Sequence, residues 1–372
     1  MTGSSAALAG ATDRCTPSTW LLTGHRAGDN NQVLALAEQL GWPFEVKQLV
    51  HRRSKLLTRL ISRQLFGITL AGIERRRSSE LAPPWPQLVI SAGRDSEPVA
   101  RWIRRQSGDR TRLVHIGRPW APLSTFDLVI TTPQYFLPPR PNVLTNQLPL
   151  HRITPARLAA AAARWQPRLA HLPRPRTAVL VGGDSGSFVL TRDKARRLGR
   201  LVEERVRRSG GSALVSSSAR TPAHAFEALC AQLDVPSHVY HWRPDDDDNP
   251  YLAYLALADE LVVTGESASM LTEASVTQKP LFVFDIGSSG GARRLPRELL
   301  LWDLRKLRNR VANHFSPPRM QRDIGDVQRR LVASGRARWL GDAPAGSCGR
   351  LAHCDTREDA RRTVERVRAL FE

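Results

Sequence analysis

The sequence predicts an α/β protein that consists of two doubly wound parallel-sheet domains in tandem, facing a central crevice. Three observations support this fold class. Short apolar segments alternate with amphipathic segments along most of the chain. A turn that contains Gly or Ser follows nearly every apolar segment, which is typical of strand–turn–helix units. The length of 372 residues suits two domains, since a domain commonly has about 150 residues.

The first domain is expected over residues 17–150, after a leader at 1–16 that we expect to be disordered. The leader has small and polar residues but lacks the basic start and the apolar stretch of a secretory signal. Apolar residues at helical spacing from Val33 to Leu40 indicate the first helix. Strands are predicted at 19–23, 44–49, 87–91, 112–116 and 126–130, and helices at 31–40 and 97–106.

A linker is expected at 151–176, where an Ala-rich helix leads into the sequence L-P-R-P-R. The second domain is expected over 177–345. The remaining segment, 346–372, is expected to hold a helix that crosses back to the first domain. In the second domain, strands are predicted at 177–181, 213–216, 237–241, 260–264 and 281–285, with helices at 191–209, 222–233, 250–258 and after 265–270.

The chain is strongly basic, with 55 Lys and Arg residues against 35 Asp and Glu residues, a formal net charge of +20. Such a charge attracts anions such as phosphates, nucleic acids or acidic membranes. A GC-rich genome that favours Arg codons is the alternative source of this excess. Aromatic residues make up only 6% of the chain and no recognition motif stands out, so we expect no nucleic-acid partner.

The chain has no apolar run near the length of about 18 residues that a membrane-spanning helix needs. Its four cysteines show neither a disulfide framework nor a common zinc-binding spacing. We therefore expect reduced thiols, no bound metal and a cytoplasmic location. The composition, 41% hydrophobic and 24% charged, is typical of a globular protein and excludes a disordered chain.

The main candidate site follows the strand that is predicted at 260–264. Glycine allows a sharp turn at this point, and the serines are suited to cap the next helix. The free N–H groups at a helix start bind anions, and a carboxylate one to two turns further accepts hydrogen bonds from ribose hydroxyls. The alternative is an ordinary capped helix with a surface glutamate. The donor-binding residues expected here are Gly265, Glu266, Ser267, Ser269, Met270 and Glu273.

A second glycine-rich loop, at 182–187, follows the strand predicted at 177–181. It lets backbone N–H groups approach a diphosphate closely, although it matches neither the dinucleotide fingerprint nor the P-loop. A tight turn without a ligand is the alternative. The acidic run at 245–248 is interpreted as a solvated loop rather than a metal site. The residues expected to contribute to donor binding are Gly182, Gly183, Asp184, Ser185, Ser217 and Ser218.

In the first domain, the loop after the strand at 19–23 contains Asp29 and His25. Either side chain is a candidate general base that deprotonates an acceptor hydroxyl, provided that it faces the crevice. The alternative for Asp29 is a cap for the helix predicted at 31–40. His115 is interpreted as a structural residue.

The stretch 52–77 carries eight Lys and Arg residues and one Glu. Arg52, Arg59 and Arg63 lie on one face of a predicted helix, with leucines on the other face. A basic amphipathic helix is typical of peripheral binding to an anionic membrane surface. The alternative is a helix that covers the sheet with a solvated Arg face.

Together, the motifs resemble those of the mitochondrial-fission "elongated mitochondria" family, and the resemblance covers nearly all of residues 19–290. Glu266 departs from the family, where Asp is common, and Gln278 stands where Gly is usual. The matching motifs are G-x-x-x-G-D-x-x-Q at 24–32, S-A-G-R at 91–94, V-H-I-G-R-P at 114–119, V-G-G-D-S at 181–185, N-P-Y at 249–251 and T-G-E-S-A-S-M-L-T-E-A at 264–274.

The resemblance implies a GT-B architecture, with two Rossmann-like domains, the donor bound mainly by the second and the acceptor by the first. Bacterial members of the family look like glycosyltransferases, and the basic, Arg-rich composition indicates a bacterial source. We therefore predict a metal-independent glycosyltransferase that needs no cofactor besides its nucleotide-sugar donor. The acceptor would be a lipid-linked or envelope glycan, placing the protein peripherally on the inner membrane. Two alternatives remain: a nucleotide-sugar epimerase, or a non-catalytic membrane adaptor, the role with which plant relatives are associated.

Overall fold

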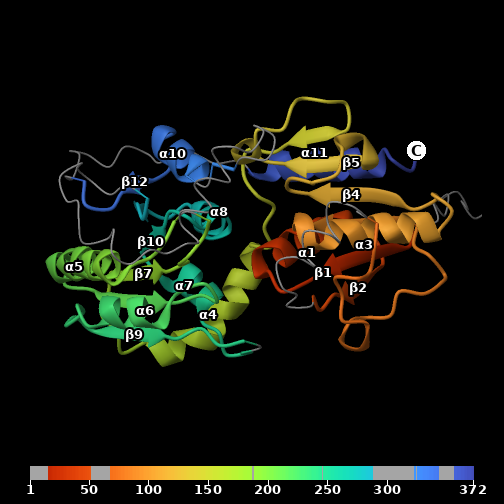
Figure 1. Ribbon diagram of the computed structural model, residues 1–372. Helices are drawn as coiled ribbons and strands as arrows, with labels where there is room; N and C mark the ends of the chain where they lie inside the picture. The colour runs from red at the N-terminus through yellow and green to blue at the C-terminus, as the bar shows by residue number, and fades with distance from the viewer. Residues whose placement is uncertain are drawn as a thin grey trace, which may run out of the picture.

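The computed structural model describes residues 16–51, 68–186, 188–244, 246–287, 322–323, 325–342 and 356–372. Within these residues the chain forms two α/β units that lie side by side (Figure 1). The leader expected at 1–16, apart from Thr16, lies outside the described residues. So does most of the basic stretch 52–77, of which residues 68–77 are described.

The first sheet has six parallel strands in the order β2-β1-β3-β4-β5-β6. The predicted strands are all present. The inner strands β1 and β3 are almost continuous apolar runs that a parallel sheet buries on both faces, whereas the edge strand β2 is mostly exposed. The strands are β1 (Thr19–Thr23), β2 (Phe44–Gln48), β3 (Leu88–Ala92), β4 (Arg112–Ile116), β5 (Leu128–Thr131) and β6 (Val143–Thr145). The helices are α1 (Ala27–Leu40) and α3 (Gly93–Gln106), with short turns η1 (Arg75–Arg77), η2 (Leu123–Thr125) and η3 (Pro133–Tyr135).

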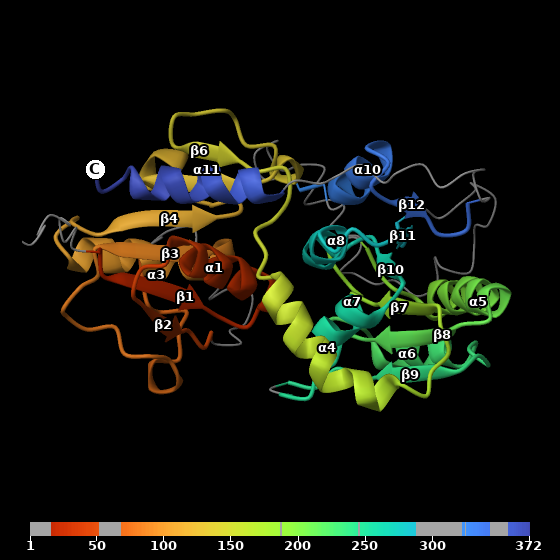
Figure 2. The same cartoon turned by 180° about the vertical axis from the view of Figure 1, so that it is seen from behind.

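The second sheet also has six parallel strands, in the order β12-β11-β10-β7-β8-β9. Its strands are β7 (Arg176–Leu180), β8 (Ser212–Ser216), β9 (Ser237–Tyr240), β10 (Glu260–Thr264), β11 (Leu281–Phe284) and β12 (Arg338–Trp339). Its helices are α4 (Pro155–Leu169), α5 (Arg192–Ser209), α6 (Ala223–Cys230), α7 (Tyr251–Leu257), α8 (Ala268–Ser275) and α10 (Asp326–Ala333). Figure 2 shows α4 running between the two units.

Helices cover both faces of each sheet, because successive strand residues point to opposite sides. In the first sheet Leu21 packs in the core under α1, and Trp20 packs in the core under α3. In the second sheet one core lies against α4, α7, α8 and α10, and the other lies against α5 and α6. The prediction of two doubly wound, Rossmann-like units is therefore confirmed.

Helix α11 (Thr356–Arg368) packs on the first sheet, although it follows the second sheet in the chain. Val367 is fully buried in the core beneath α1. The Asn146 side-chain amide donates to the Thr363 hydroxyl over 2.9 Å, and the Gln147 backbone N–H donates to the Asp359 carboxylate over 2.6 Å. The end of the chain is thus tied to the far edge of the first sheet (Figure 2).

Two helices start earlier than the sequence predicts. Helix α1 starts at Ala27 rather than at residue 31, so Asp29 lies in its first turn and does not cap it. Helix α3 starts at Gly93, directly after β3. Gly93 has a φ of +69°, a conformation that glycine adopts without strain, and this lets the strand turn into the helix without a connecting loop.

The strand orders place the topological switch points at β1/β3 in the first sheet and at β7/β10 in the second. In open α/β sheets, ligands bind beyond the carboxyl ends of the strands that flank such a point. The loops that leave these four strands are the glycine-containing loops singled out in the sequence. The strand arrows of the first sheet point toward the second unit (Figure 2), so the predicted arrangement of two Rossmann-like units that face each other is confirmed.

Candidate functional site

At the second switch point, the loop after β7 lies against the loop after β10. A Cβ on Gly182 would lie 2.0 Å from Glu266 Oε1, so no other residue fits without displacing that carboxyl group. The Gly182 N–H donates to the Thr264 hydroxyl over 2.8 Å. Gly183 has a φ of +108°, and a Cβ there would lie 2.3 Å from the Arg220 carbonyl oxygen. Both glycines are therefore required by close packing of this loop.

Glu266 is a buried carboxyl group at the centre of this packing, with a side chain that is 1% exposed. Its Oε1 lies 3.7 Å from Arg220 Nη2 and 3.3 Å from the Thr264 hydroxyl. Its Oε2 is buried and has no hydrogen-bond partner among the described residues. Burial raises the pKa of Glu266 to about 7, against the opposing effect of the Arg220 charge. This carboxyl group therefore holds its proton to a much higher pH than an exposed glutamate does.

Glu273 is a second buried carboxyl group, one turn beyond Ser269 on α8. Its Oε2 accepts a hydrogen bond of 2.5 Å from the Tyr251 hydroxyl. Burial raises the pKa of Glu273 to about 7, against the effect of the Tyr251 hydrogen bond. Glu273 lies four residues after Ser269 and three residues after Met270, so its side chain is a neighbour of both on the helix surface. Tyr251, from the N-P-Y motif, is a partner that the sequence analysis did not name.

Four of the expected donor residues use their polar groups inside the protein. Asp184 accepts a hydrogen bond from the Leu190 N–H over 3.0 Å. Ser185 forms two backbone hydrogen bonds of 2.9 Å with Phe188. The Ser217 hydroxyl accepts from the Trp242 N–H over 2.8 Å, and the Ser218 hydroxyl donates to the Gly182 carbonyl. These hydrogen bonds, made by three side chains and by the Ser185 backbone, shape the loops around the switch point.

The loop after β10 differs from the expectation in one respect. Ser267 occupies the N-cap position of α8, but its side chain makes no capping hydrogen bond. The expected capping by Ser267 is therefore wrong. Gly265 is packed against α10, since a Cβ there would lie 1.5 Å from the Oε1 of the buried Gln328. Met270 is half-buried and packs against the second-sheet core.

At the first switch point, Asp29 lies against the glycine that starts α3. A Cβ on Gly93 would lie 2.4 Å from the Asp29 carboxylate. Burial raises the pKa of Asp29, while the charges of Arg26 and Arg322 oppose this shift. His25 is exposed on the same loop, with its ring centroid 6.2 Å from that of His51.

The two switch points meet across the crevice. The Ser269 hydroxyl oxygen of α8 lies 3.2 Å from the position of a Cβ on Gly28 of α1. A second bridge joins the segment before α10 to η3, because the Arg322 Nε donates to the Gln134 side chain over 3.1 Å. The Asp323 N–H donates to the Gln134 carbonyl over 2.9 Å. Asp29 thus shares one crevice with the proposed donor loops. No fixed sequence spacing signalled the contributions of Arg322 and Gln134.

His115 lies in β4 and is fully buried. Its Nδ1 lies 3.0 Å from the Ser91 hydroxyl, and burial lowers its pKa to about 3. The ring is therefore neutral at physiological pH and acts as a packing residue.

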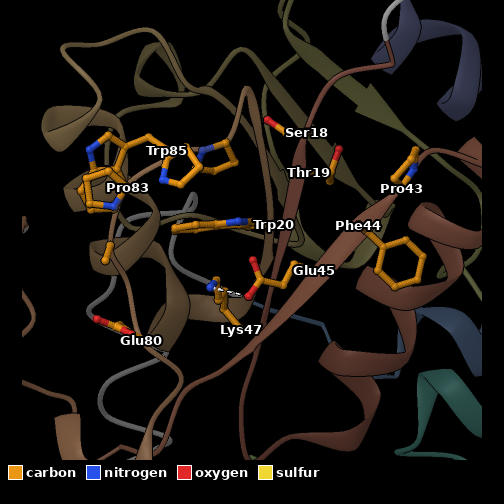
Figure 3. A pocket seen from close by; sticks show the side chains of 13 residues that line it. Ser18, Thr19, Trp20, Pro43, Phe44, Glu45, Lys47, Glu80, Pro83 and Trp85 are labelled. Atoms are coloured by element: carbon orange, nitrogen blue, oxygen red, sulfur yellow. Dashed lines mark hydrogen bonds and ion pairs between the residues drawn. The ribbon is translucent and has the colours of Figure 1, made fainter.

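A cavity of about 480 Å³ lies at the opposite end of the first sheet, where β1 and β2 begin (Figure 3). Trp20, Trp85 and Phe44 provide much of its apolar lining, and the Lys47 ammonium lies 4.2 Å from the Trp20 ring centroid. None of the predicted site residues lines this cavity, so it is distinct from the crevice.

The described residues contain no cluster of three or more His, Cys, Asp or Glu side chains suited to a metal ion. In the acidic run, Asp246 pairs with Arg243 at 3.1 Å and Asp248 pairs with Arg168 at 2.7 Å, while Asp245 lies outside the described residues. Within the described part of the chain, no helix has both the length and the hydrophobicity needed to cross a membrane.

A family model described as mitochondrial fission ELM1 matches residues 27–301 of this chain. The mitochondrial fission protein ELM1 of Arabidopsis thaliana is 31% identical over 220 residues, which are 53% of this chain and 51% of that protein. The chain therefore spans about half the length of this plant relative.

Two solved structures with similar folds are enzymes by their descriptions. The UDP-GlcNAc 2-epimerase of Neisseria meningitidis, bound to UDP-GlcNAc, has a TM-score of 0.44 and 10% identity, over 85% of this chain and 98% of that one. The ADP-heptose lipopolysaccharide heptosyltransferase II of E. coli has a TM-score of 0.40 and 12% identity, over 95% of this chain and 98% of that one.

Proposed function

The chain belongs to the mitochondrial fission ELM1 family, and from this premise we propose that it is an enzyme that transfers a sugar from a nucleotide-diphosphate sugar to an acceptor hydroxyl. One observation carries the proposal: the two switch points meet, with the Ser269 hydroxyl 3.2 Å from the Cβ position of Gly28. Donor loops and a candidate base therefore share a crevice, as transfer between two bound substrates requires.

On the donor side, the Gly183 loop and the start of α8 at Ser267 and Ser269 would bind the diphosphate through backbone N–H groups. Glu273 would accept hydrogen bonds from the ribose hydroxyls, and Tyr251 would hold its carboxyl group in place. The N–H groups at these positions would also stabilise the charge that develops on the leaving nucleotide diphosphate.

On the acceptor side, Asp29 would act as the general base. The acceptor oxygen forms a bond to the anomeric carbon while the bond from that carbon to the diphosphate oxygen breaks. The hydroxyl proton passes to the Asp29 carboxylate, and the nucleotide diphosphate leaves with the electron pair. Burial raises the pKa of Asp29, which makes it a stronger base than an exposed aspartate. His25, which is exposed, is the second candidate for this role.

Calorimetric titration with UDP-, GDP- and ADP-sugars tests the donor site. We expect at least one donor to bind, and Glu273→Ala to weaken it about tenfold or more, because hydrogen bonds to a charged group are lost. Glu204→Ala, which removes an exposed carboxylate on α5, is the matched control and should leave binding unchanged. Failure of every donor to bind the unaltered protein would refute the proposal.

A nucleotide-sugar epimerase would use the same donor site without an acceptor. Incubation of the protein with the bound donor alone distinguishes the two activities. An epimerase produces a stereoisomer of the donor under these conditions, whereas a transferase leaves the sugar configuration unchanged until an acceptor is added.

A membrane adaptor is the second candidate function, and the η1 turn favours it. Arg75, Arg76 and Arg77 are all exposed there, at the end of the basic stretch 52–77. Sedimentation with vesicles that contain anionic lipids tests this role. An adaptor retains vesicle binding when Asp29→Asn and Glu273→Ala are combined and shows no sugar turnover. The same surface would let a transferase reach a lipid-linked or envelope glycan from the cytoplasmic side of the inner membrane.

A further inference from the structure

Two arginines from different parts of the chain lie over one aromatic ring at the edge of the crevice. The Arg118 guanidinium lies 5.8 Å from the Tyr135 ring centroid, and the Arg322 guanidinium lies 5.3 Å from it. Arg118 follows β4, whereas Arg322 leads into α10, which lies against η3. In Figure 2, α10 stands where the second unit faces the first.

Neighbouring residues hold the two arginines near this ring. Gln134 is buried, and its side chain accepts a hydrogen bond of 3.1 Å from the Arg322 Nε. Its carbonyl accepts a second hydrogen bond, of 2.9 Å, from the Asp323 N–H. Arg322 is therefore held at the first domain by a buried residue. Gly117, which precedes Arg118, has a φ of +99°, and a Cβ there would lie 3.9 Å from the Tyr135 hydroxyl oxygen.

The positive charges of the arginines in this region repel one another. The charge of Arg322 lowers the pKa of Arg118, in addition to the larger effect of burial, and it lowers the pKa of Arg220 in the same way. Arg220 lies on the donor side, where its Nη2 is 3.7 Å from the Glu266 carboxyl group and its Nη1 donates to the Asp184 backbone carbonyl over 3.0 Å. Arg118 and Arg322 lie near one ring and are close enough for the charge of one to lower the pKa of the other. Guanidinium groups gathered in this way are suited to a bound phosphate.

We infer that Arg118 and Arg322 form a second anion subsite, which binds a phosphate group of the acceptor. The identification of this ligand as the acceptor rests on the proposed function. It is favoured because Gln134, Tyr135 and Arg118 follow strands of the first sheet, the domain that would bind the acceptor. Arg322 also lies close enough to Asp29 to oppose the rise of its pKa. The subsite and the proposed base would therefore act on the same molecule.

Binding of phosphate monoesters to the full chain tests this inference. The soluble probe is glycerol 3-phosphate, measured by calorimetry, and the lipid probe is a phosphatidylcholine vesicle that contains phosphatidic acid, measured by sedimentation. At least one probe should bind, and Arg118→Gln should weaken that binding about tenfold or more, as expected for a lost charged hydrogen bond. Arg322→Gln should have the same effect. Arg105→Gln, an exposed arginine at the far end of α3, is the charge-matched control.

The outcomes separate this inference from the proposed function. Glu273→Ala should weaken nucleotide-sugar binding and leave phosphate-monoester binding intact, and Arg118→Gln should do the reverse. Failure of both probes to bind, or equal binding by the unaltered protein and both arginine variants, overturns the subsite. Equal loss of nucleotide-sugar binding in Arg118→Gln overturns it too, because the arginines then belong to the donor diphosphate. Phosphate binding without any donor binding supports the subsite while refuting the transferase.

Discussion

Glu266 shows how a single residue at the switch point links the site to the stability of the fold. Its carboxyl group is enclosed by Gly182, Thr264 and Arg220, and in the part of the chain that the structure describes one of its oxygens has no hydrogen-bond partner. A buried carboxyl group in this position is stabilised by its proton. The same group would feel the charge of a diphosphate that approaches Arg220, so its protonation and ligand binding should be coupled.

The pKa of Glu266 makes a specific prediction about stability. Its pKa is about 7 in the folded protein and 4.5 ordinarily, so the folded state holds the proton more tightly. The stabilisation that comes from this tighter proton binding is thus fully present below pH 4.5. It is lost as the pH rises to about 7. Glu266→Gln should remove this dependence, changing the difference in unfolding free energy between pH 5 and pH 8 by about 1 kcal/mol or more.

Urea denaturation at the two pH values measures this difference. Glu204→Gln, an exposed glutamate on α5, serves as the control and should reproduce the pH dependence of the unaltered protein. If Glu266→Gln has the same pH dependence as the unaltered protein, then burial does not shift the pKa of this residue.

At the scale of elements, the strand-to-helix connections determine the site. The loop after β7 needs glycine because the loop after β10 approaches its backbone closely, and α3 starts at Gly93 because Asp29 lies against that residue. In both sheets a carboxyl group packs on a glycine of the neighbouring loop. Each switch point therefore has one acidic side chain, Asp29 in the first sheet and Glu266 in the second.

The packing at Gly182 yields a prediction for the loop after β7. A methyl group there would lie 2.0 Å from Glu266 Oε1, so Gly182→Ala should reduce the free energy of unfolding by about 1 to 3 kcal/mol and weaken donor binding. Gly72→Ala is the matched control, because no atom of the described residues lies within 4 Å of the added Cβ. Denaturation and donor titration of both variants measure the effect. A Gly182→Ala protein that is as stable as Gly72→Ala would contradict this packing.

For the whole molecule, the relation between the two domains depends on a few contacts. Helix α4 packs with α7 in the second domain. Arg152, just before α4, and Arg157, within it, both pair with Glu38 of the first domain. Across the crevice, Gly28 faces Ser269 and Gln134 holds Arg322. The crevice is therefore shaped by side chains that are far apart in the sequence.

Gly28 tests how closely the domains must approach. Of the residues that the structure describes, Ser269 is the one that comes within 4 Å of a Cβ built at Gly28. Gly28→Leu should therefore open the crevice without disturbing the first domain. We expect a larger radius of gyration in small-angle scattering. Sugar transfer should fall about 100-fold, because small misplacements of reacting groups have effects of this size. Gly72→Leu is the control, and unchanged scattering and turnover in Gly28→Leu would show that this contact is dispensable.

Much of the fold was predictable because its signals are local. Continuous apolar runs such as 88–92 and 260–264 are strands that a parallel sheet buries on both faces, and the glycine turns mark their carboxyl ends. The edge strands β6 and β12, which have three and two residues, were missed because they are too short to show a period. The early starts of α1 and α3 were missed because polar residues fill their first turns.

The sequence by itself determined the two parallel sheets and the loops at their switch points, since these follow from apolar periodicity and from glycine conformation. Only the tertiary structure decided how the polar groups in those loops are used. It directed Ser217 and Ser218 to the backbone, buried Glu266 and Glu273, and brought Arg322 to Tyr135. The physical reason is that hydrogen-bond partners and burial depend on the relative placement of whole elements and domains, which no fixed spacing along the chain encodes.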